Sequence, residues 1–235
     1  MKKVTLFGKH SILSALQNKN RRIFKVFLLK DSARHIEEQA VERKIDVTYV
    51  NKEFLDKVTN NSSHQGVAAE CETVFKKFSF PDSNDEEPIV ILDQITDIQN
   101  IGSIIRSAYA FGIRKVVIPS VNSPNETGAI SKLSVGCIDQ VSVEITNNIA
   151  RTTEMLKKSG YWVIGLDSKG ETNLNNFDFP KKSVIILGSE GTGIRTLVRN
   201  SCDFLVKIPM QQDAESLNVS CAATVVFNKY FTHHQ

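Results

Sequence analysis

The sequence predicts an α/β protein in which a small α/β module precedes a larger domain built on a mostly parallel sheet. The chain has 235 residues, enough for one or two domains of ordinary size. Its 41% apolar and 23% charged residues are typical of a globular protein that buries a core. After residue 88, short apolar runs alternate with helix-like segments, a pattern typical of a parallel sheet with helices on both faces.

Residues 1–75 carry short elements of both kinds. Apolar residues at helical spacing predict helices over 9–17, 32–44 and 52–58. Apolar and β-branched runs predict strands over 23–29, 47–50 and 66–71. A linker is expected over 76–88, because residues 78–88 combine two prolines with four acidic residues and show no periodicity. We therefore expect two domains, 1–75 and 89–235.

Residues 89–235 are expected to form the parallel sheet and its helices. The predicted strands are 89–92, 115–118, 141–145, 162–166, 184–187 and 204–208. The predicted helices are 101–111, 127–135, 149–159, 194–199 and 217–230. A ligand of such a sheet is expected beyond the carboxyl ends of the strands.

Composition also argues against several protein classes. No apolar run approaches the ~20 residues that span a bilayer, and no apolar segment typical of an export signal follows the basic start. Cys71, Cys137, Cys202 and Cys221 form no C-x-x-C pair, so we expect reduced core thiols, no metal site and a cytoplasmic protein. Two histidines at 233–234 are expected to be a frayed tail.

The basic excess lies in the first third of the chain. The net charge is +3, and residues 1–75 hold 13 Lys and Arg against 9 Asp and Glu, whereas the remainder holds 16 against 17. Lys19, Arg21, Arg22 and Lys25 stand close together. Phosphate contact would explain this cluster. A solvated basic turn is the alternative explanation, and charge alone favours it over phosphate contact.

The segment 184–220 is the most informative part of the sequence. One apolar run ends at the turn 188–193, a second ends at 208–210, and a long apolar helix opens after 216. Element edges of this kind leave backbone N–H and C=O groups free for a ligand. We therefore predict a small-molecule pocket here.

The turn and the last helix each allow two interpretations. The turn Gly188-Ser189-Glu190-Gly191-Thr192-Gly193 lacks the G-x-G-x-x-G fingerprint and the lysine of a P-loop. It is either a tight structural turn or one whose Glu190 faces a cationic or polar ligand. Ser216 is expected to cap the last helix, with Asn218 in its first turn. Apolar residues nearly all round this helix predict burial on more than one side, and hence a subunit interface.

A further segment, residues 97–108, follows the strand 89–92. Asn100 is expected to cap its helix. Arg106 lies about 160° from the centre of the apolar face at 100° per residue, so it points away from the core. It is either a solvated arginine or one offered to a phosphate or a ribose.

Three motifs run through these segments in order. They are Asn100-Ile101-Gly102…Arg106-Ser107-Ala108, Leu187-Gly188-Ser189-Glu190-Gly191 and Ile208-Pro209-Met210…Ser216-Leu217-Asn218-Val219-Ser220. With these motifs, residues 88–232 resemble the SpoU (TrmH) family of RNA ribose 2′-O-methyltransferases, in the knotted SPOUT superfamily. Residues 1–75 resemble the family's RNA substrate-binding domain, through Phe7-Gly8-Lys9-His10 and His64-Gln65-Gly66. This architecture is more similar to the large-subunit rRNA guanosine methyltransferases than to the tRNA branch.

The resemblance implies a SPOUT-type parallel sheet with a deep trefoil knot, S-adenosyl-L-methionine as cofactor, and a homodimer formed through the knotted domain. The residues it assigns to the cofactor are Leu187, Gly188, Gly191, Ile208, Met210 and Leu217. The residues it assigns to catalysis are Arg106, Asn100, Glu190, Ser216 and Asn218. Thr224 stands where relatives often have glycine, and we expect this change to leave the chemistry in place.

The resemblance leaves the role of Arg106 open. The family proposal makes Arg106 the general base toward the ribose hydroxyl. A guanidinium group is hardly ever deprotonated in proteins, so stabilisation of the developing alkoxide or clamping of the adjacent phosphate is equally compatible. Glu190 is expected to position Arg106 or the substrate, and Asn100 and Asn218 to orient the ribose or the arginine.

Three other functions fit parts of the sequence. A binding module that has lost catalysis is opposed by the joint presence of Asn100, Arg106, Glu190 and Asn218. A nucleotide-dependent oxidoreductase or kinase would need a glycine-rich fingerprint that the sequence lacks. A tRNA ribose methyltransferase stays open, because one basic domain can bind either RNA.

Overall fold

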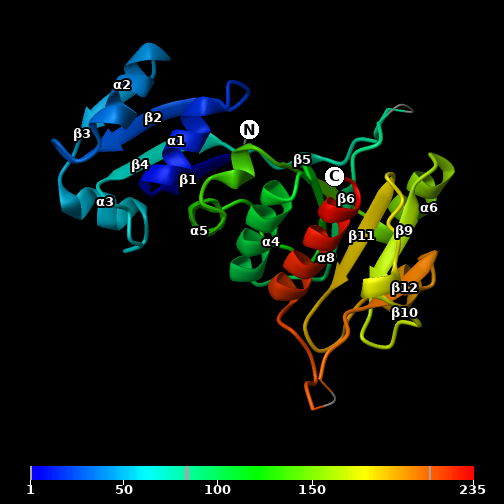
Figure 1. Cartoon of the computed structure of the whole chain (residues 1–235). Helices are drawn as coiled ribbons and strands as arrows, with labels where there is room; N and C mark the ends of the chain where they lie inside the picture. The colour runs from blue at the N-terminus through cyan, green and yellow to red at the C-terminus, as the bar shows by residue number, and fades with distance from the viewer. Residues whose placement is uncertain (1, 83–84, 212) are drawn as a thin grey trace. The chain divides into compact units, whose positions relative to one another are not determined.

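The computed structural model describes residues 2–82, 85–211 and 213–235, and these form two compact units (Figure 1). Unit 1 consists of Met1–Phe75 and Pro124–Gln140, and unit 2 of Lys76–Ser123 and Val141–Gln235. Ser83 and Asn84 of the expected linker lie outside the described residues. None of the helices in the described part of the chain is long and apolar enough to cross a membrane.

Unit 1 is built on a four-stranded sheet in the order β1-β4-β2-β3. Its strands are β1 (Lys3–Phe7), β2 (Ile23–Leu28), β3 (Asp46–Tyr49) and β4 (Val67–Glu72). Its helices are α1 (Lys9–Gln17), α2 (Arg34–Glu42), α3 (Lys52–Val58) and α5 (Gly128–Leu133). β4 is antiparallel to both of its neighbours, whereas β2 and β3 are parallel. The sequence prediction located every element in 1–75 except β1.

Each face of this sheet buries its own apolar cluster. Side chains alternate between the two faces of a strand, so Val4 and Leu6 of β1 pack with α1 and α2, while Phe7 packs with Leu55 of α3. Arg43 satisfies the carboxyl end of α1, because its Nη1 donates to the carbonyls of Ala15 and Leu16 at 3.1 and 2.7 Å. The small unit is thus a packed core with a capped helix.

Residues 124–140 belong to unit 1, although the sequence predicts them to lie in the second domain. α5 packs against β1 so closely that a Cβ on Gly128 would come within 2.3 Å of the Thr5 carbonyl oxygen. Ile130 is buried, and Glu126 and Asp139 on either side of α5 bond to the buried Arg21. These partners lie more than 100 residues away, so local sequence patterns do not show the grouping.

Unit 2 contains an eight-stranded, all-parallel sheet in the order β10-β12-β9-β11-β6-β7-β8-β5. The six strands predicted here are β6 (Ile89–Asp93), β7 (Lys115–Pro119), β8 (Ser142–Thr146), β9 (Trp162–Leu166), β11 (Ser183–Gly188) and β12 (Phe204–Lys207). The two strands not predicted, β5 (Lys76–Lys77) and β10 (Thr172–Asn173), have two residues each. The predicted α/β class with a parallel sheet is therefore confirmed.

Helices cover both faces of this sheet. Its helices are α4 (Ile98–Ala110), α6 (Ile149–Lys158), α7 (Thr196–Arg199) and α8 (Val219–His233). Ile149 and Leu156 of α6 and Val198 of α7 pack on one face. α4 and α8 lie side by side over the sheet (Figure 1), joined by hydrogen bonds from Asn218 to Asn100 and between Ser107 and Thr224.

Three local predictions in unit 2 are wrong. α4 begins at Ile98 with Asp97 as its cap, because Asp97 Oδ1 accepts the Gln99 N–H at 2.9 Å, so Asn100 lies within the first turn. α8 begins at Val219 and is capped by Asn218 rather than Ser216. The chain end is not frayed, because His234 packs on Tyr230 with ring centroids 4.6 Å apart.

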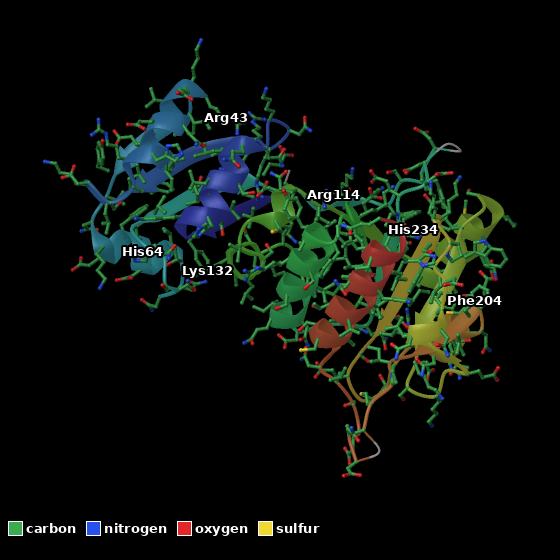
Figure 2. The ribbon with its side chains drawn as sticks, in the orientation of Figure 1. Arg43, His64, Arg114, Lys132, Phe204 and His234 are labelled. Carbon is green, nitrogen blue, oxygen red and sulfur yellow. The ribbon has the colours of Figure 1, made fainter. Side chains whose placement is uncertain are left out.

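The carboxyl end of α8 is fixed by an aromatic chain. Tyr230 donates its hydroxyl to the Lys181 carbonyl at 2.8 Å and contacts Phe179, which leads through Phe177 to Phe204 at the start of β12. Figure 2 labels Phe204 and His234, one near each end of this series of aromatic rings. The last helix is therefore held at both ends, by Asn218 at its start and by these rings at its finish.

Candidate functional site

A pocket of about 370 Å³ opens beyond the carboxyl ends of β9, β11 and β12. All six residues predicted to bind a cofactor line it, together with two of the predicted catalytic residues. These eight are Leu187, Gly188, Gly191, Ile208, Met210, Leu217, Glu190 and Ser216. The three element edges selected from the sequence therefore form one pocket, at the end of the sheet where a ligand is expected.

The glycine turn is both a tight structural turn and a wall of this pocket. Ser189 and Gly193 exchange backbone hydrogen bonds of 3.2 and 2.9 Å, which close the turn on itself. A Cβ on Gly188 would lie 2.2 Å from the Gly193 carbonyl carbon, so no side chain fits there. Gly191 and Gly193 have φ of 88° and 68°, a conformation that favours glycine. The two interpretations of the turn are thus compatible.

Glu190, Asn100 and Asn218 form a polar cluster, named here the Glu190 cluster. Glu190 Oε1 accepts from Asn218 Nδ2 at 2.6 Å, from Asn100 Nδ2 at 3.1 Å and from the Val219 N–H at 3.2 Å. Asn218 Nδ2 also donates to Asn100 Oδ1 at 2.9 Å. The carboxylate therefore lies at the amino end of α8, where the helix dipole favours negative charge. Three segments far apart in sequence meet at this point.

Arg106 stands apart from the pocket lining. It is exposed on the outer face of α4, as its helical position predicts. Its suggested partner Glu190 bonds instead to the two asparagines and to α8, and no salt bridge joins Arg106 to Glu190 within the described parts of the chain. These contacts do not favour the positioning of Arg106, one of the two roles expected for Glu190, and they leave the positioning of the substrate as a prediction.

Two buried or half-buried carboxylates at the strand ends are missing from the predicted site. Asp93 ends β6 and bonds to Arg195, and Asp167 follows β9 and lines the pocket. Burial opposes ionisation of Asp167, but hydrogen bonds from Arg199 Nε at 2.7 Å and the Lys169 N–H at 2.8 Å outweigh it and lower the pKa of the carboxyl group. Both are the first acidic residue at or just after an apolar strand, a signal present in the sequence.

Thr224 fills a position beside the Glu190 cluster on α8. Its hydroxyl lies 2.8 Å from the Ser107 hydroxyl and donates to the Ser220 carbonyl at 2.9 Å. The side chain thus bridges α4 and α8 in the turn next to Arg106. The helices accommodate threonine here with its hydroxyl satisfied.

The two short motifs of unit 1 meet in the structure. Gln65 Oε1 accepts the Lys9 N–H at 3.0 Å. His64, labelled in Figure 2, is buried rather than exposed, with Nε2 3.0 Å from Asp56 Oδ1 and Nδ1 accepting the Gly66 N–H at 3.0 Å. Its role is therefore to shape the loop before β4.

Two other expectations about side chains need correction. Arg21 of the basic cluster is 2% exposed, so it neither contacts phosphate nor forms a solvated turn. All four cysteines are free, but Cys221 is exposed on α8 rather than buried in a core. Burial raises the pKa of Cys71 and of Cys202 to about 12, so both thiols stay protonated. No cluster of three or more His, Cys, Asp or Glu suited to a metal ion forms among the described residues.

Comparison with known proteins decides the family. The model of the SpoU rRNA Methylase family matches residues 87–228, and a model described as RNA 2′-O ribose methyltransferase substrate binding matches residues 5–75. The chain belongs to the SpoU rRNA Methylase family. The resemblance drawn from the three motifs is thereby confirmed, and so is the presence of the family's substrate-binding module.

Individual relatives in this family match over nearly their whole length. The 23S rRNA (guanosine-2′-O-)-methyltransferase RlmB of Xanthomonas campestris is 36% identical over 94% of this chain and 92% of its own. YacO of Bacillus subtilis, provisionally named a TrmH family tRNA/rRNA methyltransferase, is 32% identical over 96% and 94%. The crystal structure of the SpoU methyltransferase AviRb from Streptomyces viridochromogenes with AdoMet superposes with a TM-score of 0.83, 19% identity, and coverage of 99% and 90%.

Proposed function

We propose that this protein transfers a methyl group from S-adenosyl-L-methionine to a ribose 2′-hydroxyl of RNA. The observation that carries the proposal is the pocket at the ends of β9, β11 and β12, which gathers all six predicted cofactor residues beside Glu190. Membership of the SpoU rRNA Methylase family supports the same reaction. Because its substrate would be RNA, we place the enzyme in the cytoplasm.

The residues of the pocket suit this cofactor. Its volume of about 370 Å³ lies within the ~300–1,000 Å³ of small-molecule sites. Backbone groups at Gly188, Ile208 and Leu217 offer hydrogen bonds, and Asp167 and Glu190 place carboxylates where a cationic ligand is favoured. When bound, the sulfonium group supplies an activated methyl whose leaving group is a neutral thioether.

The protein's own contribution concerns the ribose hydroxyl, which must lose its proton as it attacks. Arg106 carries a positive charge that would stabilise the developing alkoxide or hold the neighbouring phosphate. The Glu190 cluster would orient the ribose at the mouth of the pocket through Asn100 and Asn218.

A homodimer would complete the site. Arg106 is exposed on α4 and does not line the pocket of its own chain. Apolar side chains are exposed on the same two helices, with Tyr109 38% exposed on α4 and Val225 42% exposed on α8. We propose that a second copy covers these helices and brings the two halves of the site together.

We also propose that unit 2 contains the deep trefoil knot of the SPOUT superfamily, because the chain belongs to the SpoU rRNA Methylase family.

Ribosomal RNA is the favoured substrate. Unit 1 contains the substrate-binding module, and the RlmB relatives, which act on 23S rRNA guanosine, cover it. The structure of an rRNA methyltransferase from Sinorhizobium meliloti covers 99% of this chain, whereas that of the A. aeolicus TrmH/SpoU tRNA modifying enzyme covers 65%. We therefore propose a guanosine of large-subunit rRNA over a tRNA nucleotide.

Two measurements test the proposal. Calorimetry with S-adenosyl-L-methionine should show binding, and a module that has lost catalysis would show none. Ribose-methylation mapping of total RNA from cells with and without the gene should reveal one missing mark in large-subunit rRNA. A mark lost from tRNA would instead establish the tRNA alternative.

The variant Arg106→Ala separates binding from chemistry. Because Arg106 lies outside the pocket lining, cofactor affinity should stay unchanged while methyl transfer falls by about 10³-fold. Arg106→Lys is the matched control, since it keeps the positive charge but lacks the planar guanidinium group that binds phosphate in a bidentate manner. Near wild-type transfer by Arg106→Ala would show that the arginine has no essential role.

A further inference from the structure

Asp93, which is buried, and Arg195, whose side chain is 45% exposed, form an ion pair that the proposed chemistry does not use. Asp93 is the last residue of β6 and is fully buried. Its Oδ2 accepts the Arg195 N–H at 2.9 Å, and its Oδ1 accepts Arg195 Nε at 2.7 Å and lies 2.7 Å from Nη2. A single residue therefore binds both oxygens, with its backbone and its side chain together.

Arg195 leaves the glycine turn that walls the pocket. The turn 188–193 is closed by the bonds between Ser189 and Gly193, and its first residue packs against its last. Such a closed turn moves as one piece. The chain leaves the turn through the buried Ile194, and the next residue, Arg195, is bound to Asp93 at the end of β6. The attachment of the turn to the sheet on this side is therefore set two residues after the turn ends.

The tip of the same turn is held by different contacts. Glu190 bonds to Asn100, Asn218 and the amino end of α8. The turn is thus held at its tip by the Glu190 cluster and at its base by Asp93. The backbone and the side chain of Arg195 both donate to the Asp93 carboxylate. Two such charge-assisted bonds fix the orientation of the arginine as well as its position, which a single hydrogen bond would not.

We propose that Asp93 and Arg195 are positioning residues that hold the turn 188–193 in the conformation that binds the cofactor. This inference rests on the proposed function, because it assigns the pocket to S-adenosyl-L-methionine. Neither residue needs to touch the ligand. Their effect on it acts through Gly188, Glu190 and Gly191, which line the pocket.

The alternative is that Arg195 only stabilises the fold, because a buried carboxylate such as Asp93 needs a positive charge and hydrogen bonds to offset its loss of hydration. Asp203 offers a matched control in the same sheet. Its Oδ2 accepts the Val163 N–H at 2.8 Å and its Oδ1 pairs with Lys157 at 2.6 Å, but it lies at the amino ends of β9 and β12, away from the pocket. Asp93→Asn and Asp203→Asn each remove one charge from a comparable contact.

The test compares cofactor affinity in the full-length variants. Calorimetry and steady-state kinetics should show that Asp93→Asn raises both Kd and KM for S-adenosyl-L-methionine about tenfold, with a smaller loss of kcat at saturating cofactor. Asp203→Asn should lower the melting temperature while its Kd stays within about twofold of wild type. In the protein without ligand, the Gly193 amide should exchange faster in Asp93→Asn than in Asp203→Asn.

Arg195→Lys keeps the inference testable if Asp93→Asn fails to fold, because lysine retains the charge beside Asp93 and should give an intermediate rise in Kd. Wild-type Kd in these two variants would overturn the positioning role and leave the proposed function standing. A wild-type protein that methylates no RNA and binds no cofactor would overturn the proposed function itself.

Discussion

The two units use the same kinds of side chain in opposite ways. In unit 1, Arg21 lies between Glu126 and Asp139, a group named here the Arg21 cluster, and all three side chains are at most 1% exposed. In unit 2, Glu190 and Asn218 of the Glu190 cluster are exposed, and Glu190 lines a pocket. One polar cluster is closed to solvent, and the other opens onto space for a ligand.

The difference lies in what the hydrogen bonds leave unused. Glu126 Oε1 lies 2.5 Å from Arg21 Nη2, and its Oε2 accepts from the Thr73 hydroxyl and the Val74 N–H at 2.7 Å each. Both oxygens of Asp139 lie 3.0 Å from Arg21 Nη1. Among the described residues, the hydrogen bonds of Glu190 all involve Oε1. Arg21 Nε has no hydrogen-bond partner in the described part of the chain, but all four carboxylate oxygens of the Arg21 cluster are occupied. A cluster whose acceptors are all used holds a fold together, whereas a cluster with a spare acceptor can take a substrate.

The largest expected effect comes from breaking the closed cluster. Arg21→Met leaves two buried carboxylates without a cation, so unfolding free energy should fall by about 3–5 kcal/mol. The chain's one tryptophan, Trp162, lies in unit 2, so its fluorescence follows that unit while far-UV circular dichroism follows both. Urea unfolding should show an early transition by dichroism that fluorescence does not report.

The control for this variant removes all three charges at once. Arg21→Met combined with Glu126→Gln and Asp139→Asn should recover part of the lost stability, because no unpaired charge stays buried. Coincident, unshifted transitions for Arg21→Met would contradict the view that the Arg21 cluster holds unit 1 together.

Breaking the open cluster should affect activity more than stability. Glu190→Gln keeps the shape of the side chain but removes the charge from the pocket, so kcat should fall about 10²-fold. Its melting temperature should change little because Glu190 is exposed. If Glu190→Gln lost as much stability as Arg21→Met and kept its kcat, the Glu190 cluster would be structural and the distinction between the two clusters would be wrong.

A smaller effect is expected at the start of α8. Asn218→Ala removes the cap that accepts the Ser220 N–H at 2.9 Å and should cost about 1 kcal/mol of stability. Asn218→Asp is the matched variant, since it restores the cap but places a second carboxylate beside Glu190. Chemical denaturation together with methylation assays should find Asn218→Asp more stable than Asn218→Ala yet equally inactive.

The smallest effect concerns pH. Burial raises the pKa of Asp139, and the attraction of Arg21 opposes this rise only in part. An acid with a raised pKa in the folded state contributes stability at pH below its unfolded value near 3.8, and that contribution is lost as pH rises through the folded pKa. Wild type should therefore gain stability relative to Asp139→Asn as pH falls from 7 toward 3.8. An unchanged difference between the two proteins in urea unfolding would contradict this assignment.

The sequence was most informative where structure is local. The predicted bounds of α1, α3 and β9 coincide with the observed ones, because helical spacing and apolar runs depend on neighbours in the chain. β1 was missed although Val4 and Leu6 alternate correctly, since its apolar run is short and begins among lysines. The pocket could be predicted because its walls are strand ends, and the end of each apolar run marks one of them.

Long-range charge pairing could not be predicted in the same way. Asp93 and Arg195 are 102 residues apart, and Arg21 and Glu126 are 105 apart. The residues next to Arg21 and to Asp93 in the sequence do not indicate which distant residue each one pairs with. Arg21 was therefore grouped with its basic neighbours, and Asp93 was left out of the predicted site. The cap of α8 was misplaced by two residues because Ser216 and Asn218 both suit that position.

The return of residues 124–140 to unit 1 has a consequence for how such proteins diverge. The chain passes between the two units at 75–76, at 123–124 and again at 140–141. A gene fusion or deletion that moves residues 1–75 alone would strip Glu126 and Asp139 of Arg21 and expose Ile130. We therefore expect unit 1 to keep its stability in a transfer between relatives only when residues 124–140 are moved together with residues 1–75.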